Sequence, residues 1–347
     1  MLKSLFIILS FIPFAPCIFA EKNPEELGKV QWNRTLEEAQ KMAIRDKKPI
    51  FILFQEIPGC GTCKNYGTEV LSHPLIAEAI ETFFIPLAIH NNKNGSDKKT
   101  LDYFEEPSWN NPVVRIVKTD LSPLVTRLSG NYTAFGLVSK INAALLKNGQ
   151  KIPEYLKLLE EELLARAVGT EKATLGMYCF WSGEKNYAQL DGVIGTRAGY
   201  VKGSEVVEVE YNPNKISLEQ LVSFGAKSKN ADKIYMVNEN VSGSKKINIP
   251  HVKLDNFRVD PESKYYLFKT TYKYVPMSSL QATKINSLLS ENINPDFLLS
   301  PNQKKILEQV KTKSLKKNAK PDRIRYLYSI SDFRNTIKQM IKYSSCC

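Results

Sequence analysis

The chain has 347 residues, of which 43% are hydrophobic and 24% are charged, and its net charge is +12. This composition is ordinary for a globular protein and excludes wholesale disorder, while the length allows two domains that each bury a core. The three histidines, His73, His90 and His251, are scattered without metal-ligand spacing, so we expect no metal site and no cofactor.

The first twenty residues have the pattern of a secretory signal. Lys3 supplies a positive charge, residues 5–19 are apolar but broken by prolines, and Ala20 precedes the charged Glu21. The apolar run is short and interrupted, which is untypical of a membrane span. We predict a signal peptide over residues 1–20, cleaved after Ala20, and a secreted or periplasmic location. An uncleaved N-terminal anchor is the alternative.

Residues 30–148 are predicted to alternate helices and strands. The apolar run at 49–54 is typical of a buried strand, and Pro58-Gly59 predicts a turn before a helix that Cys60 opens. Further expected elements are helices at 36–45 and 132–146, a strand at 83–89, and a pair of strands at 112–117 and 123–128 joined by a turn at 119–120.

Cys60-Gly-Thr-Cys63 is the first chemical motif. A cysteine at a helix N-terminus lies at the positive end of the helix dipole, which lowers its pKa and favours the thiolate. The order of elements, Trp32, this motif and the loop Asn111-Pro112 resemble a thioredoxin domain. The resemblance implies dithiol–disulfide exchange by Cys60 and Cys63, with Pro112 in a substrate-binding loop. A zinc half-site and a static disulfide are the alternatives.

One departure from that family precedes the motif. The family usually has a tryptophan directly before the first cysteine, whereas Ile57-Pro58-Gly59 precedes Cys60 here.

A linker is predicted over residues 149–170, with a charged helix at 153–168 whose leucines pack between two domains. Residues 171–275 then indicate a second, α+β domain. A strand at 173–176 leads to a turn at Cys179 and a helix through Leu190, and the alternating strand 206–211 precedes a capped helix from Ser217.

Residues 171–225 resemble the peptide-methionine (S)-S-oxide reductase family, MsrA, through Tyr-Cys-Phe-Trp at 178–181, Gly199-Tyr200, Glu205 and the segment 211–217. The resemblance implies that Cys179 is the nucleophile, and that Tyr200 and Glu205 hold and protonate the sulfoxide oxygen. Phe180 and Trp181 would receive the S-methyl group.

The chemistry requires these residue types. A sulfoxide sulfur becomes electrophilic when its oxygen is protonated, so a thiolate must attack while an acid delivers a proton. The cysteine is left as a sulfenic acid, which a second thiol converts to a disulfide. Glu184 matches a supporting glutamate of the family.

Two features depart from the MsrA family. Its Asp-x-Gly-x-Gln-Tyr-Arg segment has no clean match, and only Asp232 and Tyr235 stand near the expected place. Tyr178 replaces a glycine directly before Cys179, which predicts either a crowded pocket or a distorted turn.

Residues 276–347 form a lysine-rich tail with predicted helices at 280–289, 303–315 and 332–343. Its end, Cys346-Cys347, resembles the resolving cysteines that MsrA enzymes often keep in a C-terminal segment; soft-metal chelation and no function are the alternatives. The basic surface allows weak membrane contact, and without a nucleic-acid motif we expect no nucleic acid partner.

Apart from Cys17 in the predicted signal, five cysteines remain, and an odd number in an oxidising compartment favours an exchanging thiol. The combined hypothesis is an exported, two-domain reductase that acts on oxidised methionine in proteins or peptides and draws on an upstream thiol reductant. The alternatives are a thiol–disulfide oxidoreductase whose second domain binds clients without catalysis, and a non-enzymatic cell-envelope protein.

Overall fold

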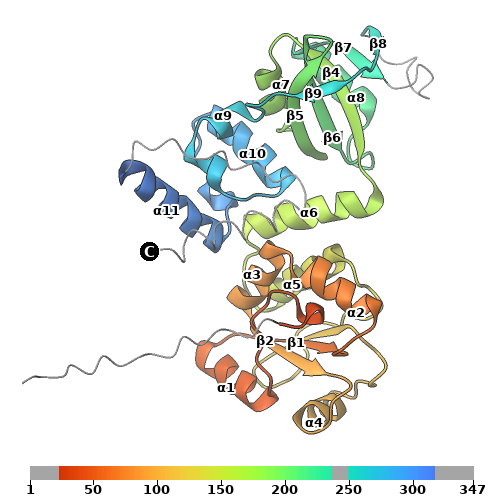
Figure 1. The fold of residues 1–347 in the computed structure, drawn as a ribbon, viewed down its shortest axis with the longest axis vertical. Helices are drawn as coiled ribbons and strands as arrows, with labels where there is room; N and C mark the ends of the chain where they lie inside the picture. The colour runs from red at the N-terminus through yellow and green to blue at the C-terminus, as the bar shows by residue number, and fades with distance from the viewer. Residues whose placement is uncertain (1–22, 237–248, 317–347) are drawn as a thin grey trace, which may run out of the picture.

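The structure is a computed structural model that describes residues 23–236 and 249–316. Two β-sheets, each with its own hydrophobic core, lie toward opposite ends of the long axis, with helices between them (Figure 1). The predicted signal peptide, the helix at 332–343 and Cys346-Cys347 lie outside the described residues and stay predictions.

The N-terminal sheet contains three strands in the order β2-β1-β3, with β1 parallel to β2 and antiparallel to β3. β1 is buried throughout because its side chains alternate between two cores: Phe51 and Leu53 face one, and Ile52 and Phe54 face the other. The elements of this part are η1 (Glu25–Leu27), α1 (Leu36–Asp46), β1 (Ile50–Gln55), α2 (Gly61–Asn65), η2 (Tyr66–Leu71), α3 (Pro74–Phe83), β2 (Ile85–His90), α4 (Ser96–Tyr103), β3 (Val113–Val117) and α5 (Ala134–Lys147).

Helices cover both faces of this sheet, so the predicted α/β class is confirmed. Ala39 and Ala43 of α1 and Leu101 of α4 join one core, while residues of α3 and α5 join the other.

The predicted pair of strands after residue 112 is only half right. β3 forms, but residues 123–128 meet it only at two isolated bridges, Val114 with Leu128 and Val117 with Pro123. Between the two bridges the chain advances by three residues in β3 but by five in the segment 123–128. The two extra residues cannot pair in register, so no second strand forms.

The C-terminal sheet has six strands in the order β8-β7-β4-β6-β5-β9, and all neighbours are antiparallel except β7 and β8. This arrangement confirms the predicted α+β class, while the domain boundaries stay predictions. The elements are β4 (Glu171–Met177), α7 (Phe180–Tyr187), β5 (Val193–Val201), β6 (Ser204–Tyr211), α8 (Leu218–Lys227), β7 (Ala231–Met236), β8 (His251–Lys253), β9 (Phe257–Val259), α9 (Tyr265–Phe268) and η4 (Thr271–Tyr274).

The sequence prediction omitted β5 and extended α7 too far. β5 pairs with β6 through the two-residue turn Lys202-Gly203, where both residues have positive φ (50° and 83°), as a type I′ hairpin requires. α7 ends at Tyr187 rather than at Leu190. The capped helix is confirmed, because Ser217 and Gln220 form a complete capping box at α8.

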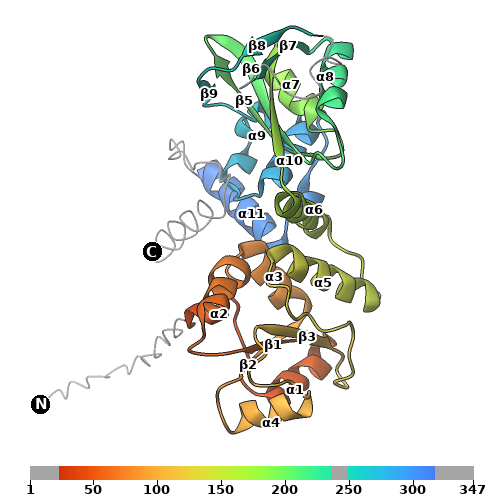
Figure 2. The same ribbon diagram turned by 90° about the vertical axis from the view of Figure 1, so that its right-hand side faces the viewer.

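Three helices lie between the sheets: α6 (Glu154–Val168), α10 (Ser279–Ser290) and, after η5 (Asp296–Leu298), α11 (Pro301–Lys316) (Figure 2). Leu156 and Leu159 of α6 join the N-terminal core, while its Ala165 packs with Ile194 and Leu280. α6 therefore contacts both sides, but the predicted leucines belong to the N-terminal core and Ala165 supplies the contact with the other side.

Buried carboxylates fix these helices. Glu162 of α6 accepts a hydrogen bond from the Leu280 amide at the start of α10 (3.0 Å). Glu78 of α3 accepts bonds from the Ser300 hydroxyl and the Asn302 amide at the start of α11, both at 2.6 Å. A carboxylate at a helix N-terminus satisfies amides that have no partner within the helix.

A second buried group joins elements within the C-terminal part. The carboxylate of Glu184 in α7 has no solvent exposure and accepts bonds from the Ala198 amide of β5 (2.9 Å), the Ser263 hydroxyl (2.9 Å) and the Lys264 amide (2.6 Å). Lys264 is equally buried, and its ammonium donates to the Thr196 carbonyl. Burial raises the pKa of Glu184 and lowers that of Lys264, while the charge of each opposes the shift of the other.

Within residues 23–236 and 249–316, no helix combines the length and apolar character that spanning a bilayer requires.

Lys264→Met should destabilise the C-terminal part by about 3–5 kcal/mol, because it leaves the Glu184 carboxylate buried without its opposing charge. Urea unfolding measures this, followed by the fluorescence of Trp181 in a background with Trp32→Phe and Trp109→Phe. Lys202→Met, which removes an exposed ion pair with Asp255, is the matched control and should change little. Equal stability of the two variants would contradict the view that the Lys264 charge stabilises the buried Glu184 carboxylate.

Candidate functional site

The dithiol lies where β1 ends and α2 begins. Cys60 is the N-cap of α2 and is exposed, whereas Cys63, one turn later, is buried, and their sulfurs are 3.8 Å apart. The Cys63 thiol donates to the Asn111 side-chain oxygen at 2.7 Å. This bond places the Asn111–Pro112 loop beside the dithiol, and the peptide bond between the two residues is cis.

The two thiols differ in acidity. Hydrogen bonds from the backbone amide of Cys63 and, to a lesser extent, from its thiol hold the pKa of Cys60 below its usual value. Burial, with the neighbouring Cys60 sulfur, raises the pKa of Cys63 to about 11. The exposed cysteine therefore has the lower pKa and the access that a nucleophilic thiol needs, whereas the raised pKa of the buried cysteine favours its protonated form.

Glu56 completes a group that the sequence analysis did not identify. One carboxylate oxygen of Glu56 and the sulfurs of Cys60 and Cys63 all lie within 4.8 Å of one another. Gly59 permits this tight turn, because a Cβ there would lie 2.4 Å from the Glu56 carbonyl oxygen and 2.6 Å from the Cys63 Cβ. The amide of Gly59 donates to buried Glu26 at 2.8 Å.

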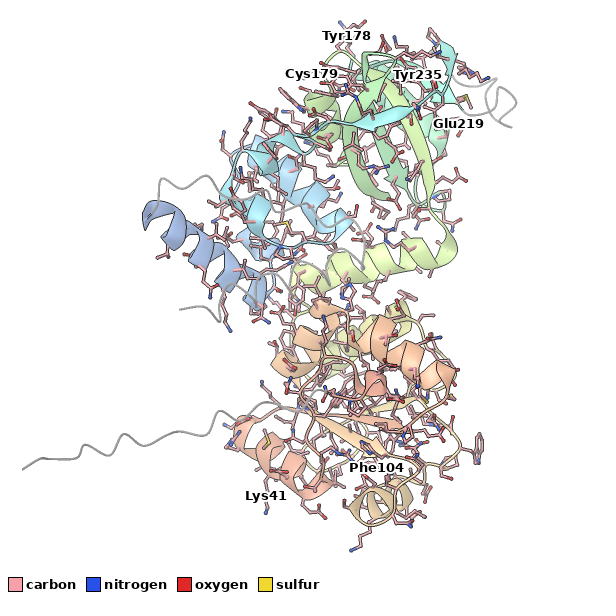
Figure 3. The ribbon with its side chains drawn as sticks, in the orientation of Figure 1. Lys41, Phe104, Tyr178, Cys179, Glu219 and Tyr235 are labelled. Carbon is pink, nitrogen blue, oxygen red and sulfur yellow. The ribbon has the colours of Figure 1, made fainter. Side chains whose placement is uncertain are left out.

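Cys179 is built in a similar way in the other sheet. It follows β4, is the N-cap of α7 and is exposed. Tyr178 is 76% exposed, and its side chain points outward, next to Cys179 (Figure 3).

Tyr200 and Glu205 meet at Phe180, the residue that follows Cys179. They are directly opposed across the β5–β6 hairpin, whose turn fixes their pairing. Glu205 accepts the Phe180 amide at 2.9 Å, and the Tyr200 ring meets the Phe180 ring edge-on at 5.3 Å. Burial and the charges of Asp260 and Glu205 raise the pKa of Tyr200, so its phenol stays protonated.

Phe180 is 3% exposed and belongs to the core, whereas Trp181 is only partly buried. Trp181 donates to Asp260 at 3.2 Å and stacks on Tyr265 at 4.0 Å between ring centroids.

Residues 260–266 were not predicted as part of this site. The rings of Tyr265 and Tyr266 are 5.5 Å apart, and burial together with the Cys179 sulfur raises the pKa of Tyr266. The signal in the sequence was the pair Tyr265-Tyr266, but contacts between residues far apart in the sequence bring this segment to α7. Ser263 and Lys264 bind Glu184, and Asp260 and Tyr265 contact Trp181.

Other predicted residues are not brought together. Tyr235 packs with Val201 and Val206 in a separate cluster. The dithiol at α2 and Cys179 at α7 lie in different parts of the molecule, with α6 between them in both views (Figures 1 and 2).

Comparison with known families supports the assignment of the first part. A family model described as thioredoxin-like matches residues 31–119. This part of the chain is thioredoxin-like, and the predicted dithiol and Pro112 both lie within it.

Curated relatives carry the second resemblance. Peptide methionine sulfoxide reductase MsrA of Corynebacterium glutamicum (strain R) is 42% identical over 74 residues, which cover 16% of this chain and 34% of that protein. The MsrA of Thermoactinomyces vulgaris is 37% identical over 68 residues, covering 15% of this chain and 55% of that protein. The chain thus spans about a third to about half of the length of these relatives.

Two solved structures are similar at low identity. A thioredoxin from Thermus thermophilus has a TM-score of 0.30 and 19% identity and covers 35% of this chain and 90% of its own. A DsbH oxidoreductase has a TM-score of 0.30 and 17% identity and covers 37% of this chain and 92% of its own.

In the reduced native protein, iodoacetamide should modify Cys60 well before Cys63, and the rate at Cys60 should titrate at a lower pH than a free cysteine. Peptide mass spectrometry across a pH series measures both. Cys63→Ala removes one hydrogen bond to the Cys60 sulfur and should move this titration to higher pH. Faster modification of Cys63 would reverse the assigned roles.

Proposed function

We propose that the protein is an exported, thiol-based reductase of peptide methionine-S-sulfoxide, with Cys179 as its nucleophile and the Cys60–Cys63 dithiol as its built-in reductant. The observation that carries this proposal is the meeting of Tyr200 and Glu205 on Phe180, the residue that follows Cys179. Curated relatives named MsrA support the substrate class.

In the proposed reaction, the Cys179 sulfur takes the oxygen equivalent from the substrate. Its thiolate attacks the sulfoxide sulfur while Glu205 supplies one proton to the oxygen and Tyr200 donates a hydrogen bond to it. Collapse of the adduct releases the thioether and leaves a sulfenic acid on Cys179. Glu205 suits this role because its carboxylate is partly exposed and is positioned by the Phe180 amide.

A thiol must then close the cycle. Cys346 or Cys347 condenses with the sulfenic acid, giving a disulfide to Cys179 and water, and the other tail cysteine then displaces Cys179 to leave a Cys346–Cys347 disulfide. Cys60 attacks this tail disulfide, which regains its two thiols while Cys60 and Cys63 become a disulfide. This order fits the acidity of the two thiols, since Cys60 is the more acidic and Cys63 the resolving partner. An upstream thiol reductant restores the dithiol.

The proposed setting is outside the cytoplasm, as the signal-like residues 1–20 suggest. The proposed clients are proteins or peptides with oxidised methionine. The basic surface of the tail provides weak contact with anionic membranes.

With dithiothreitol and a peptide containing methionine-S-sulfoxide, the full chain should release reduced peptide. Cys179→Ser should abolish turnover, and Glu205→Gln and Tyr200→Phe should each lower kcat on the order of 100-fold, because the first removes the proton donor and the second removes a hydrogen bond to the sulfoxide oxygen. Liquid chromatography of the peptide measures the rate. Glu37→Gln and Tyr103→Phe, at exposed positions far from Cys179 in the sequence, are the matched controls. Turnover that survives Cys179→Ser rules the proposal out.

A second candidate is a thiol–disulfide oxidoreductase whose C-terminal sheet binds clients without reducing them. The exposed Trp109 favours it: 81% of this side chain is exposed, on the loop that presents Asn111 and Pro112 to the dithiol. The tryptophan that thioredoxins usually have directly before the first cysteine is absent here. Trp109 instead offers an exposed aromatic ring to a client, from a different loop near the dithiol.

Insulin reduction distinguishes the two candidates. The second candidate predicts that insulin reduction is lost in Cys60→Ser and unchanged in Cys179→Ser, and that Trp109→Ala raises the KM for insulin severalfold. It also predicts that no reduced methionine peptide is released. Detectable sulfoxide reduction that depends on Cys179 would exclude this second candidate.

A further inference from the structure

The turn that carries the dithiol places three metal-binding atoms together. The sulfurs of Cys60 and Cys63 and a carboxylate oxygen of Glu56 lie within 4.8 Å of one another. None of the proposed redox steps uses Glu56.

The spacing of the two sulfurs fits a tetrahedral metal ion. With metal–sulfur bonds of ~2.3 Å at a tetrahedral angle, two thiolates stand about 3.8 Å apart. The sulfurs of Cys60 and Cys63 are 3.8 Å apart. No backbone movement is therefore needed to bring both sulfurs onto one ion.

Glu56 supplies a third ligand from the same turn. Because Gly59 has no Cβ, it can pack against both the Glu56 carbonyl oxygen and the Cys63 Cβ, where a Cβ would lie 2.4 and 2.6 Å away, so the turn keeps Glu56 close to the dithiol. The Glu56 side chain is partly exposed, so it can rotate toward an ion between the sulfurs. Cys60 is exposed and leaves an approach from solvent, with room for a water as the fourth ligand.

We propose that the reduced dithiol, together with Glu56, binds one thiophilic divalent cation of the zinc class. Two thiolates select such an ion over magnesium or calcium, which take oxygen ligands. Binding replaces the two thiol protons: one cation enters, two protons leave, and no electrons move. The disulfide form has no thiolate to offer, so the site exists only in the reduced protein, and a bound cation occupies the sulfur that would attack a disulfide.

The test uses the full chain with Cys17→Ser, Cys179→Ser, Cys346→Ser and Cys347→Ser, which leaves Cys60 and Cys63 as its only thiols. This background lacks the proposed sulfoxide nucleophile, so the outcome is independent of that activity. Co²⁺ is added to the reduced protein without oxygen, and sulfur-to-cobalt charge-transfer and tetrahedral d–d bands are recorded. Zn²⁺ affinity is measured by competition with a chromophoric chelator, and proton release in weak buffer.

We expect one cation and two released protons per chain, no binding after oxidation to the disulfide, and loss of the spectrum in Cys60→Ser or Cys63→Ser. Glu56→Gln should weaken Zn²⁺ binding on the order of tenfold or more, whereas the exposed control Glu37→Gln should not. Far-UV circular dichroism checks that each variant is folded. Equal affinity of Glu56→Gln and Glu37→Gln, or binding that survives Cys60→Ser, would overturn the proposed three-ligand site.

Discussion

The arrangement around Cys179 depends on one buried carboxylate. Glu184 sits on the helix that Cys179 opens, and it receives three hydrogen bonds from β5 and from residues 263–264. An ionised carboxylate without exposure is costly unless its oxygens are satisfied, so these partners cannot move independently of α7. The strand that carries Tyr200 and the segment that carries Tyr265 and Tyr266 are thereby set in position around the exposed sulfur.

The two cysteine sites share a local design and differ in what completes it. In each, a strand ends and an exposed cysteine becomes the N-cap of the next helix. At α2 a second, buried cysteine follows one turn later and makes a complete redox couple. Phe180 and Trp181 follow Cys179 instead, so this site has aromatic surface and an acid nearby but, among the described residues, no neighbouring thiol.

Local patterns predicted much of this fold. The apolar run of β1, the turn before Cys60 and the capping box of α8 each depend on residues close in sequence, and all three were found. What the sequence did not reveal depends on turn geometry, which residue types alone do not specify. β5 was missed although Lys202-Gly203 is a hairpin turn, and its pairing with β6 is what aligns Tyr200 with Glu205. Glu56 escaped notice because only the close turn at Gly59 brings it to both sulfurs.

The contacts that hold the helices between the two sheets limit how reducing equivalents can pass from one cysteine site to the other. Glu162 and Glu78 are buried carboxylates that bind the first amides of α10 and α11, and the leucines of α6 enter the N-terminal core. A rotation of one part toward the other would break these charge-assisted hydrogen bonds and leave both carboxylates buried without donors. Each unsatisfied group would cost roughly 1–3 kcal/mol, or more because it is charged. Direct attack of Cys60 on a disulfide at Cys179 is therefore disfavoured by the helices between them. A cycle that uses both sites requires a carrier that leaves the two parts in place, either the cysteines at the end of the chain or a second molecule.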